Sequence, residues 1–241
     1  MKKEIKKINW SSVGYGLLTV AWAGISCLLA QFIVGYPMLW LLGKVTFEQP
    51  VWTTVYTALV YVVAAALVII APRLIKKSWK SSREKLGLKG LPTFTDIGIG
   101  IIGFIATIIV SGIIMWVCGE LHLIDTGQAQ YTGFNNLYNP TDRIVAFLAL
   151  VIFAPVAEEI IFRGWLYGKL KKHVNVAISI ILTAIIFAVL HGQWNVGIVV
   201  GIMSAIMCVE RELTGTIYAG IITHMLKNGI AFWIRFVFMG I

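Results

Sequence analysis

Long apolar stretches recur from one end of this chain to the other, and they constrain its fold more than any other feature. Of the 241 residues, 59% are hydrophobic and only 13% are charged, and the mean hydropathy is +0.85. A transmembrane helix needs about 20 consecutive apolar residues, and several stretches reach that length. Lipid permits only helices or closed barrels, and the sequence lacks strand-type alternation. We therefore predict an all-α, polytopic membrane helical bundle.

The apolar stretches predict seven transmembrane helices, or eight if a short extra span is present near the C-terminal end. The charged residues 210–212 are expected to form a hinge between the last two helices, and Gly229 is a candidate break within the last one. By residue number, the expected helices are 10–33 with an extension toward 42, 51–71, 97–117, 143–166, 176–190, 196–209 and 216–238.

The basic residues lie mainly in short loops between the apolar stretches. The net charge is +9, and Lys and Arg gather at the N-terminus and in loops at 73–89 and 169–172. Loops rich in Lys and Arg stay on the cytoplasmic side of a membrane, and these three segments fall on one side of seven alternating spans. We therefore expect a multi-pass protein of the cell membrane, with its N-terminus cytoplasmic and its C-terminus outside. Topology accounts for the basic charge, so nucleic acid is not expected as a partner.

Three ionisable residues, Glu158, Glu159 and Arg163, lie close together inside one apolar stretch. A charge at the centre of a membrane helix costs about 2.5–3.5 kcal/mol even on the mildest scale, so these groups need partners. Glu159 and Arg163 are four residues apart in the favoured acid-before-base order and can neutralise each other. Neighbouring residues point about 100° apart on a helix, which leaves Glu158 as the free carboxylate and a candidate general base. The alternative is an ion network that only ties helices together.

Two histidines follow on later helices. Phe187 and His191 are four residues apart at the end of one helix, and His224 and Asn228 share one face of the last helix. His191 is either a surface or capping residue or a partner of Glu158 and His224. The other pair offers two donors for an oxyanion hole, or an interhelical hydrogen-bond clip. Since the first 140 residues carry almost no ionisable group within their spans, we interpret the first three helices as scaffold.

A flat arrangement of the helices would separate Glu158 and His191 in depth. The helical rise places them on the order of 10–15 Å apart along the membrane normal. Either a tilt of the helix that carries Glu158 or a deep start of the helix that carries His191 would close this gap. The sequence does not decide between the two.

In this order and on separate helices, the three motifs resemble those of the CAAX protease and bacteriocin-processing family, also called Abi, which includes the Rce1-type CAAX prenyl endopeptidases. The resemblance covers about 142–231. It divides the chain into N-terminal helices with a basic cytoplasmic loop at 1–95 and a catalytic membrane domain at 96–241. The motifs are Glu158-Glu159-x-x-x-Arg163, Phe187-x-x-x-His191 and His224-x-x-x-Asn228.

The resemblance implies intramembrane cleavage of a peptide bond in a peptide or small membrane protein. Glu158 and His191 would position and deprotonate a water molecule, and His224 and Asn228 would hold the oxyanion. Glu159 and Arg163 would set the geometry, with Phe187 in support. A prenylated substrate is not expected, and the sequence does not identify the substrate or the oligomeric state.

Three alternatives remain open at this stage. Glu158, His191 and His224 could bind zinc with water as a fourth ligand, although no His-Glu-x-x-His helix is present and we expect no cofactor. The protein could instead be a bacteriocin self-immunity or partner-regulating factor without catalysis. A weaker alternative is a transporter with Glu158 as a proton site, which the lack of an internal repeat disfavours.

Overall fold

The computed structural model describes residues 10–43, 49–72, 82–128, 130–134 and 137–239, and this part of the chain is helical with no strand. The all-α prediction is confirmed for these residues. The basic N-terminus at 1–9 and the part of the basic loop at 73–81 lie outside them. The helices before the Glu-Glu motif are α1 (Trp10–Leu42), α2 (Gln49–Ala65) with its π-helical continuation η1 (Ala66–Ile70), α4 (Phe94–Glu120) and α5 (Pro140–Phe147).

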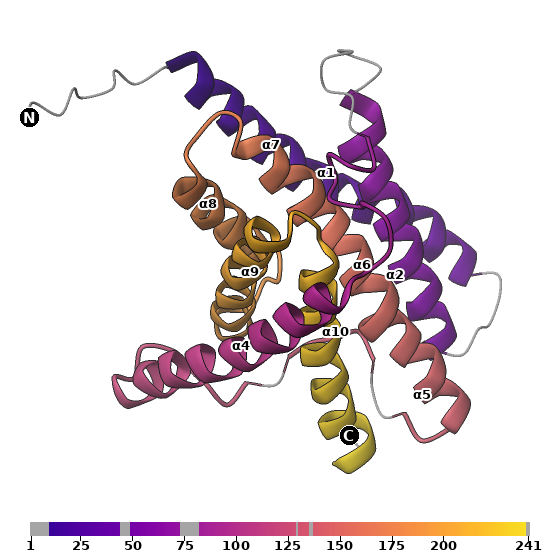
Figure 1. The fold of residues 1–241 in the computed structure, drawn as a ribbon. Coiled ribbons are helices and arrows are strands. Elements are labelled where there is room, and N and C mark those ends of the chain that lie inside the picture. The colour runs from indigo at the N-terminus through magenta and orange to yellow at the C-terminus, as the bar shows by residue number, and fades with distance from the viewer. Residues whose placement is uncertain (1–9, 44–48, 73–81, 129, 135–136, 240–241) are drawn as a thin grey trace, which may run out of the picture.

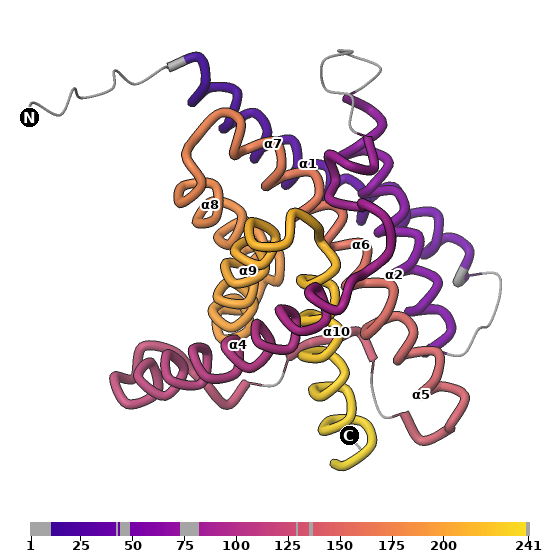
Figure 2. Tube along the Cα trace, in the orientation of Figure 1, coloured from indigo at the N-terminus to yellow at the C-terminus, as the bar shows by residue number. Residues whose placement is uncertain are grey.

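The remaining helices build the C-terminal half. A continuous helical run from α5 to α7 is made of α-helical and π-helical segments, which Figure 2 shows as one unbroken path. In chain order, the further elements are η3 (Leu148–Phe153), α6 (Ala154–Glu158), η4 (Glu159–Tyr167), α7 (Gly168–Leu170), α8 (Val176–Val189), α9 (Trp194–Thr214), α10 (Tyr218–Phe232) and η5 (Trp233–Phe238).

Four helical runs in the described residues are long and apolar enough to cross a membrane: Ser11–Leu41, Gln49–Ile70, Phe94–Glu120 and Pro140–Leu170. The chain is therefore a multi-pass membrane protein. The apolar helix α8 has 14 residues and is about 21 Å long, which is less than the roughly 30 Å of a hydrocarbon core. The total of seven spans stays a prediction.

Side-chain caps fix where two of the helices begin. Asn139 accepts a hydrogen bond from Thr141 N at 2.9 Å, and Pro140 occupies the first turn of α5. Asn175 in the same way accepts from Ile178 N at 2.8 Å at the start of α8. Such caps satisfy backbone donors that the helix itself leaves unpaired. Only residues 171–175 separate α7 from α8, so α8 folds back beside the helix that precedes it.

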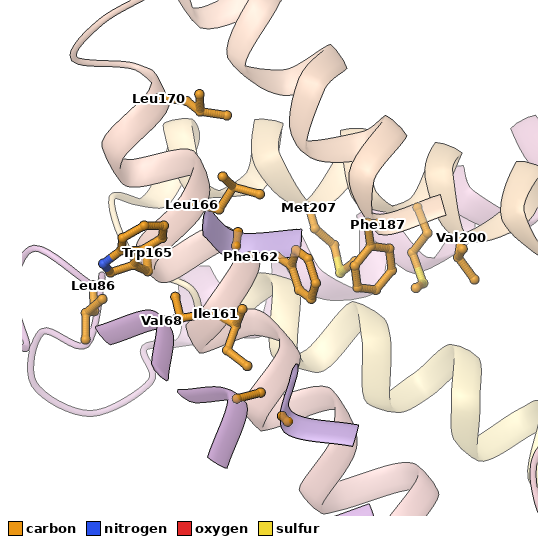
Figure 3. Close-up of a cluster of buried hydrophobic side chains, with 14 of the residues drawn as sticks. Val68, Leu86, Ile161, Phe162, Trp165, Leu166, Leu170, Phe187, Val200 and Met207 are labelled. Atoms are coloured by element: carbon orange, nitrogen blue, oxygen red, sulfur yellow. The ribbon is translucent and has the colours of Figure 1, made fainter. Parts of the chain in front are cut away.

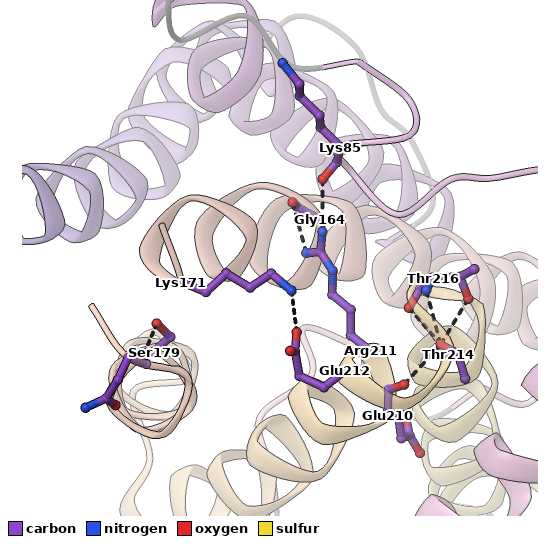
Figure 4. Close-up of polar contacts among 10 residues, drawn as sticks. Lys85, Gly164, Lys171, Ser179, Glu210, Arg211, Glu212, Thr214 and Thr216 are labelled. Carbon is purple, nitrogen blue, oxygen red and sulfur yellow. Dashed lines mark hydrogen bonds and ion pairs between the residues drawn. The ribbon is translucent and has the colours of Figure 1, made fainter. Parts of the chain in front are cut away.

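The predicted hinge at residues 210–212 is wrong, because α9 continues through them to Thr214. The helix ends where Gly215 adopts a φ of +70°, a left-handed conformation that favours glycine. The charged residues are accommodated by partners outside α9 (Figure 4). Arg211 donates to Gly164 O and to Lys85 O, both at 3.0 Å, and Lys171 pairs with Glu212 at 2.5 Å.

The predicted break at Gly229 is also wrong. Helix α10 passes through Gly229 and continues directly into η5. A glycine lowers helix propensity by about 1 kcal/mol, which does not end a helix that is packed on its neighbours. His224 and Asn228 therefore lie on one uninterrupted helix.

One hydrophobic core joins the N-terminal helices to the C-terminal half. Ile161, Phe162 and Trp165 of η4 pack in a cluster with Val68 of η1 and with Phe187 of α8 (Figure 3). Between helices in a membrane, van der Waals packing of this kind is a main source of stabilisation. The core thus crosses the expected domain boundary at 95–96, and it supports the polar site on the same helical run.

Candidate active site

Glu159 and Arg163 form a fully buried ion pair at the start of η4. Arg163 Nη1 lies 3.1 Å from Glu159 Oε1, and both side chains are 0% exposed. The two groups are in ionic contact without the alignment of a hydrogen bond. The guanidinium also lies over the ring of Phe187, 4.5 Å from its centroid, in a cation–π contact. The i, i+4 pairing predicted from the sequence is present.

His224 of α10 lies between the two glutamates. Its Nδ1 is 3.1 Å from Glu159 Oε1, and its Nε2 is 3.6 Å from Glu158 Oε2. The side chain is only 3% exposed. A ring nitrogen of histidine that carries a proton can donate it to a carboxylate oxygen. Both ring nitrogens therefore face carboxylates, and this link joins α10 to the Glu-Glu helix.

Glu158 is not a free carboxylate. The hydroxyl of Tyr61 in α2 donates a hydrogen bond to Glu158 Oε1. Glu158 is 8% exposed, so its carboxylate reaches only a small open space. The interpretation of the first three helices as scaffold is therefore wrong for α2. A phenol hydroxyl within an apolar helix needs a hydrogen-bond partner, and this need was the only sequence signal that pointed to Tyr61.

A cavity of about 180 Å³ lies beside Glu158. Glu158 and His191 both line it, together with Tyr61 from α2 and with Cys27 and Gln31 from α1. No ion pair joins His191 directly to Glu158 within the part of the chain that the structure describes. The cavity exceeds the space that a single water molecule requires. The cavity therefore has room for water molecules next to both side chains.

The structure closes the gap in depth that a flat arrangement would leave between Glu158 and His191, because α8 runs back beside η4. The rings of Phe162 and Phe187 meet edge to face at 4.9 Å between centroids. Glu158 lies one turn before Phe162, and His191 lies one turn after Phe187. Since the two helices are antiparallel (Figure 1), both steps lead toward the same end of the bundle. This geometry brings both residues to one cavity.

Phe187 is the apolar centre of the site. It is 1% exposed, and its ring lies 4.8 Å from the ring of His191 and 6.0 Å from that of His224. His191 Nδ1 lies 2.7 Å from Phe187 O, which leaves Nε2 available to a substrate or a water molecule. Phe187 thereby fixes the position of both histidines and of Arg163.

Asn228 lies one turn beyond His224 on α10. Its Nδ2 donates to Leu150 O in η3 at 3.0 Å. This bond uses one of the two protons of the amide nitrogen and fixes the direction of the other. The structure therefore places Asn228 beside the helix that carries Glu158, although the amide is partly engaged with the backbone.

The same residues define what a metal ion would require. Within the described ranges, no group of three His, Cys, Asp or Glu side chains is arranged to hold a metal ion. Nδ1 of His191 and Nδ1 of His224 already face protein oxygens. A zinc ion would therefore need the two Nε2 atoms and the carboxylate of Glu158 to converge.

Fold and site together define a multi-pass helical membrane protein with a buried glutamate–histidine centre beside a small cavity. Residues 140–230 match the family described as type II CAAX prenyl endopeptidase Rce1-like, so this segment of the chain is similar to that family. The match confirms the resemblance predicted from the three motifs and covers nearly the same residues. The search of curated proteins and the search of solved structures found no match.

Proposed function

We propose that this protein is an intramembrane endopeptidase that hydrolyses a peptide bond in a membrane-associated peptide or small membrane protein. The observation that carries the proposal is that Glu158 and His191, from two different helices, line one cavity. The family match at 140–230 supports a peptidase, because the family is described as one of endopeptidases.

In the proposed reaction, Glu158 and His191 hold a water molecule in the cavity. Glu158 accepts a proton while the water oxygen forms a bond to the carbonyl carbon of the substrate. His224 and the second amide proton of Asn228 stabilise the oxyanion. The carbon–nitrogen bond then breaks, and the leaving amine takes the proton from Glu158. Glu159 acts through His224, whose Nδ1 it contacts, and Arg163 acts through Glu159.

We propose that the reaction needs no cofactor, with zinc held by Glu158, His191 and His224 as the alternative mechanism. Elemental analysis of the purified protein tests this choice. Less than stoichiometric zinc together with activity that survives chelation is the expected result. One tightly bound zinc per chain, with activity lost on chelation and restored by zinc, would support the alternative.

Substitution of the proposed base tests the function itself. Glu158→Gln keeps the shape of the side chain but removes the base, which should lower the rate of cleavage about 10²- to 10⁴-fold. The measurement is quantitative proteomics of membrane fractions, in which cells that carry Glu158→Gln should accumulate a precursor. The control is Glu120→Gln, since Glu120 is exposed at the far end of α4.

The control variant should match the wild type in both cleavage and expression. A Glu158→Gln protein that is folded in the membrane and still processes every substrate would contradict the proposal. Bacteriocin immunity that survives both Glu158→Ala and His191→Ala would favour a non-catalytic role. Synthetic prenylated and unprenylated versions of the accumulated precursor then show whether a lipid group is recognised.

A further inference from the structure

The wall of the cavity opposite His191 comes from helices outside the matched segment. Tyr61 belongs to α2, and Cys27 and Gln31 belong to α1, whereas the family match begins at residue 140. Two contacts hold this wall in place. Trp22 Nε1 donates to Leu67 O at 3.2 Å, which joins α1 to η1, and Thr54 Oγ1 donates to Val145 O at 3.4 Å, which joins α2 to α5.

Each oxygen of the Glu158 carboxylate has a polar neighbour from another helix. Oε1 accepts the hydrogen bond from Tyr61, and Oε2 lies 3.6 Å from His224 Nε2. The two partners lie on α2 and α10, on different sides of α6. The hydrogen bond from Tyr61 restrains one oxygen, whereas the His224 contact at 3.6 Å is an ion-pair contact that is too long for a hydrogen bond. Tyr61 therefore determines which way Glu158 faces in the cavity.

We propose that Tyr61 is a positioning residue for Glu158, and that α2 thereby completes the active site of the matched segment. This inference rests on the proposed endopeptidase function. The competing explanation is that the Tyr61 hydroxyl only needs an acceptor in an apolar helix. A role limited to stability would change the amount of folded protein, whereas a positioning role changes the turnover of protein that is correctly folded.

The first test separates turnover from substrate binding. Tyr61→Phe keeps the ring and removes the hydroxyl, so the fold should persist. With a synthetic peptide spanning the cleavage site of the accumulated precursor, kcat should fall about 10- to 100-fold while KM is unchanged, because a hydrogen bond to a charged group is lost. The matched control is Tyr56→Phe, five residues earlier in α2, where the tyrosine lines a different cavity.

The second test does not depend on activity. Infrared difference spectra of wild type against Glu158→Gln, recorded in lipid nanodiscs, isolate the carboxyl band of Glu158. This band should shift in Tyr61→Phe, which loses the hydrogen bond, and should stay in place in Tyr56→Phe. An unshifted band, or an unchanged kcat in Tyr61→Phe, would overturn the role of Tyr61. A wild-type protein that cleaves no peptide would instead overturn the proposed function.

Discussion

Each buried charge of the site is compensated by a partner within direct contact. Arg163 and Glu159 are both 0% exposed, and Glu159 also contacts His224. Lys171 and Glu212, by contrast, form an ion pair with side chains that are 35% and 31% exposed. Water stabilises the separated charges of an exposed pair, but it cannot reach a buried one. The two pairs should therefore differ sharply in what their loss costs.

We expect Glu159→Gln to lower the free energy of unfolding by about 3–5 kcal/mol, because it leaves the guanidinium of Arg163 buried without a carboxylate. The matched variant Glu212→Gln should cost no more than about 1 kcal/mol. Unfolding in detergent, followed by circular dichroism, measures both. The double variant Glu159→Gln/Arg163→Met should recover most of the loss. Equal costs for the two single variants would show that the buried pair does not stabilise the fold.

The sequence predicts the contacts of the site that depend on local helix geometry. Glu159 and Arg163 lie four residues apart, and that spacing was sufficient to pair them. The contacts of Glu158 with Tyr61 and with His224 join residues 97 and 66 positions apart, as the residue numbers give. Such contacts depend on which helices pack against one another. Neither helical periodicity nor the local spacing of residues indicates that packing. For that reason Glu158 was interpreted as a free carboxylate, although Tyr61 and His224 both contact it.

Helix positions were predictable where a local cap or a long apolar stretch marks them. The start of α5 at Pro140 is set by its Asn139 cap and lies three residues before the predicted start at 143. The predicted hinge at 210–212 was wrong because other elements supply partners for its charged side chains. Arg211, for example, donates to Gly164 O and to Lys85 O. Propensity and charge alone cannot account for partners supplied by another element.

Close packing of α4 on α10 gives a prediction at the scale of the element. A Cβ atom at Gly100 would lie 2.8 Å from Ala219 O and 2.8 Å from Ile222 Cβ, whereas a Cβ at Gly98 would meet nothing within 4 Å. Gly100→Ala should therefore destabilise the protein by about 1–3 kcal/mol through overpacking. Gly98→Ala should be neutral or stabilising by up to about 1 kcal/mol, because alanine favours the helix. The midpoint of thermal unfolding compares them.

The two glycines lie in the same helix, so the comparison removes any general effect of alanine on α4. Thr223 Oγ1 donates to Gly100 O at 2.8 Å, which marks the closest approach of α10. If Gly100→Ala and Gly98→Ala shifted the midpoint equally, the proposed contact between these helices would be wrong. Loss of the contact should also lower activity, since α10 carries His224 and Asn228.

At the scale of the whole molecule, charge separates the two ends of the bundle. In Figure 1, α7 and the start of α1 lie at one end, and the start of α5 and the end of η5 lie at the other. The end near α7 carries Lys169, Lys171 and Lys172, and the opposite loops carry Glu120, Asp125 and Asp142. A helix path that begins at one end and finishes at the other needs an odd number of crossings, as the predicted seven spans would provide.

This separation of charge predicts how the protein lies in the membrane. Lysines and arginines in short loops are retained on the cytoplasmic side, so Lys172 should be cytoplasmic and Asp125 external. In a variant whose native cysteines are replaced by serine, Asp125→Cys should react with a membrane-impermeant maleimide in intact cells. Lys172→Cys should react only after the cells are opened, although both positions are exposed in the structure. The reverse pattern would invert the orientation, and labelling of both in intact cells would require an even number of crossings between them.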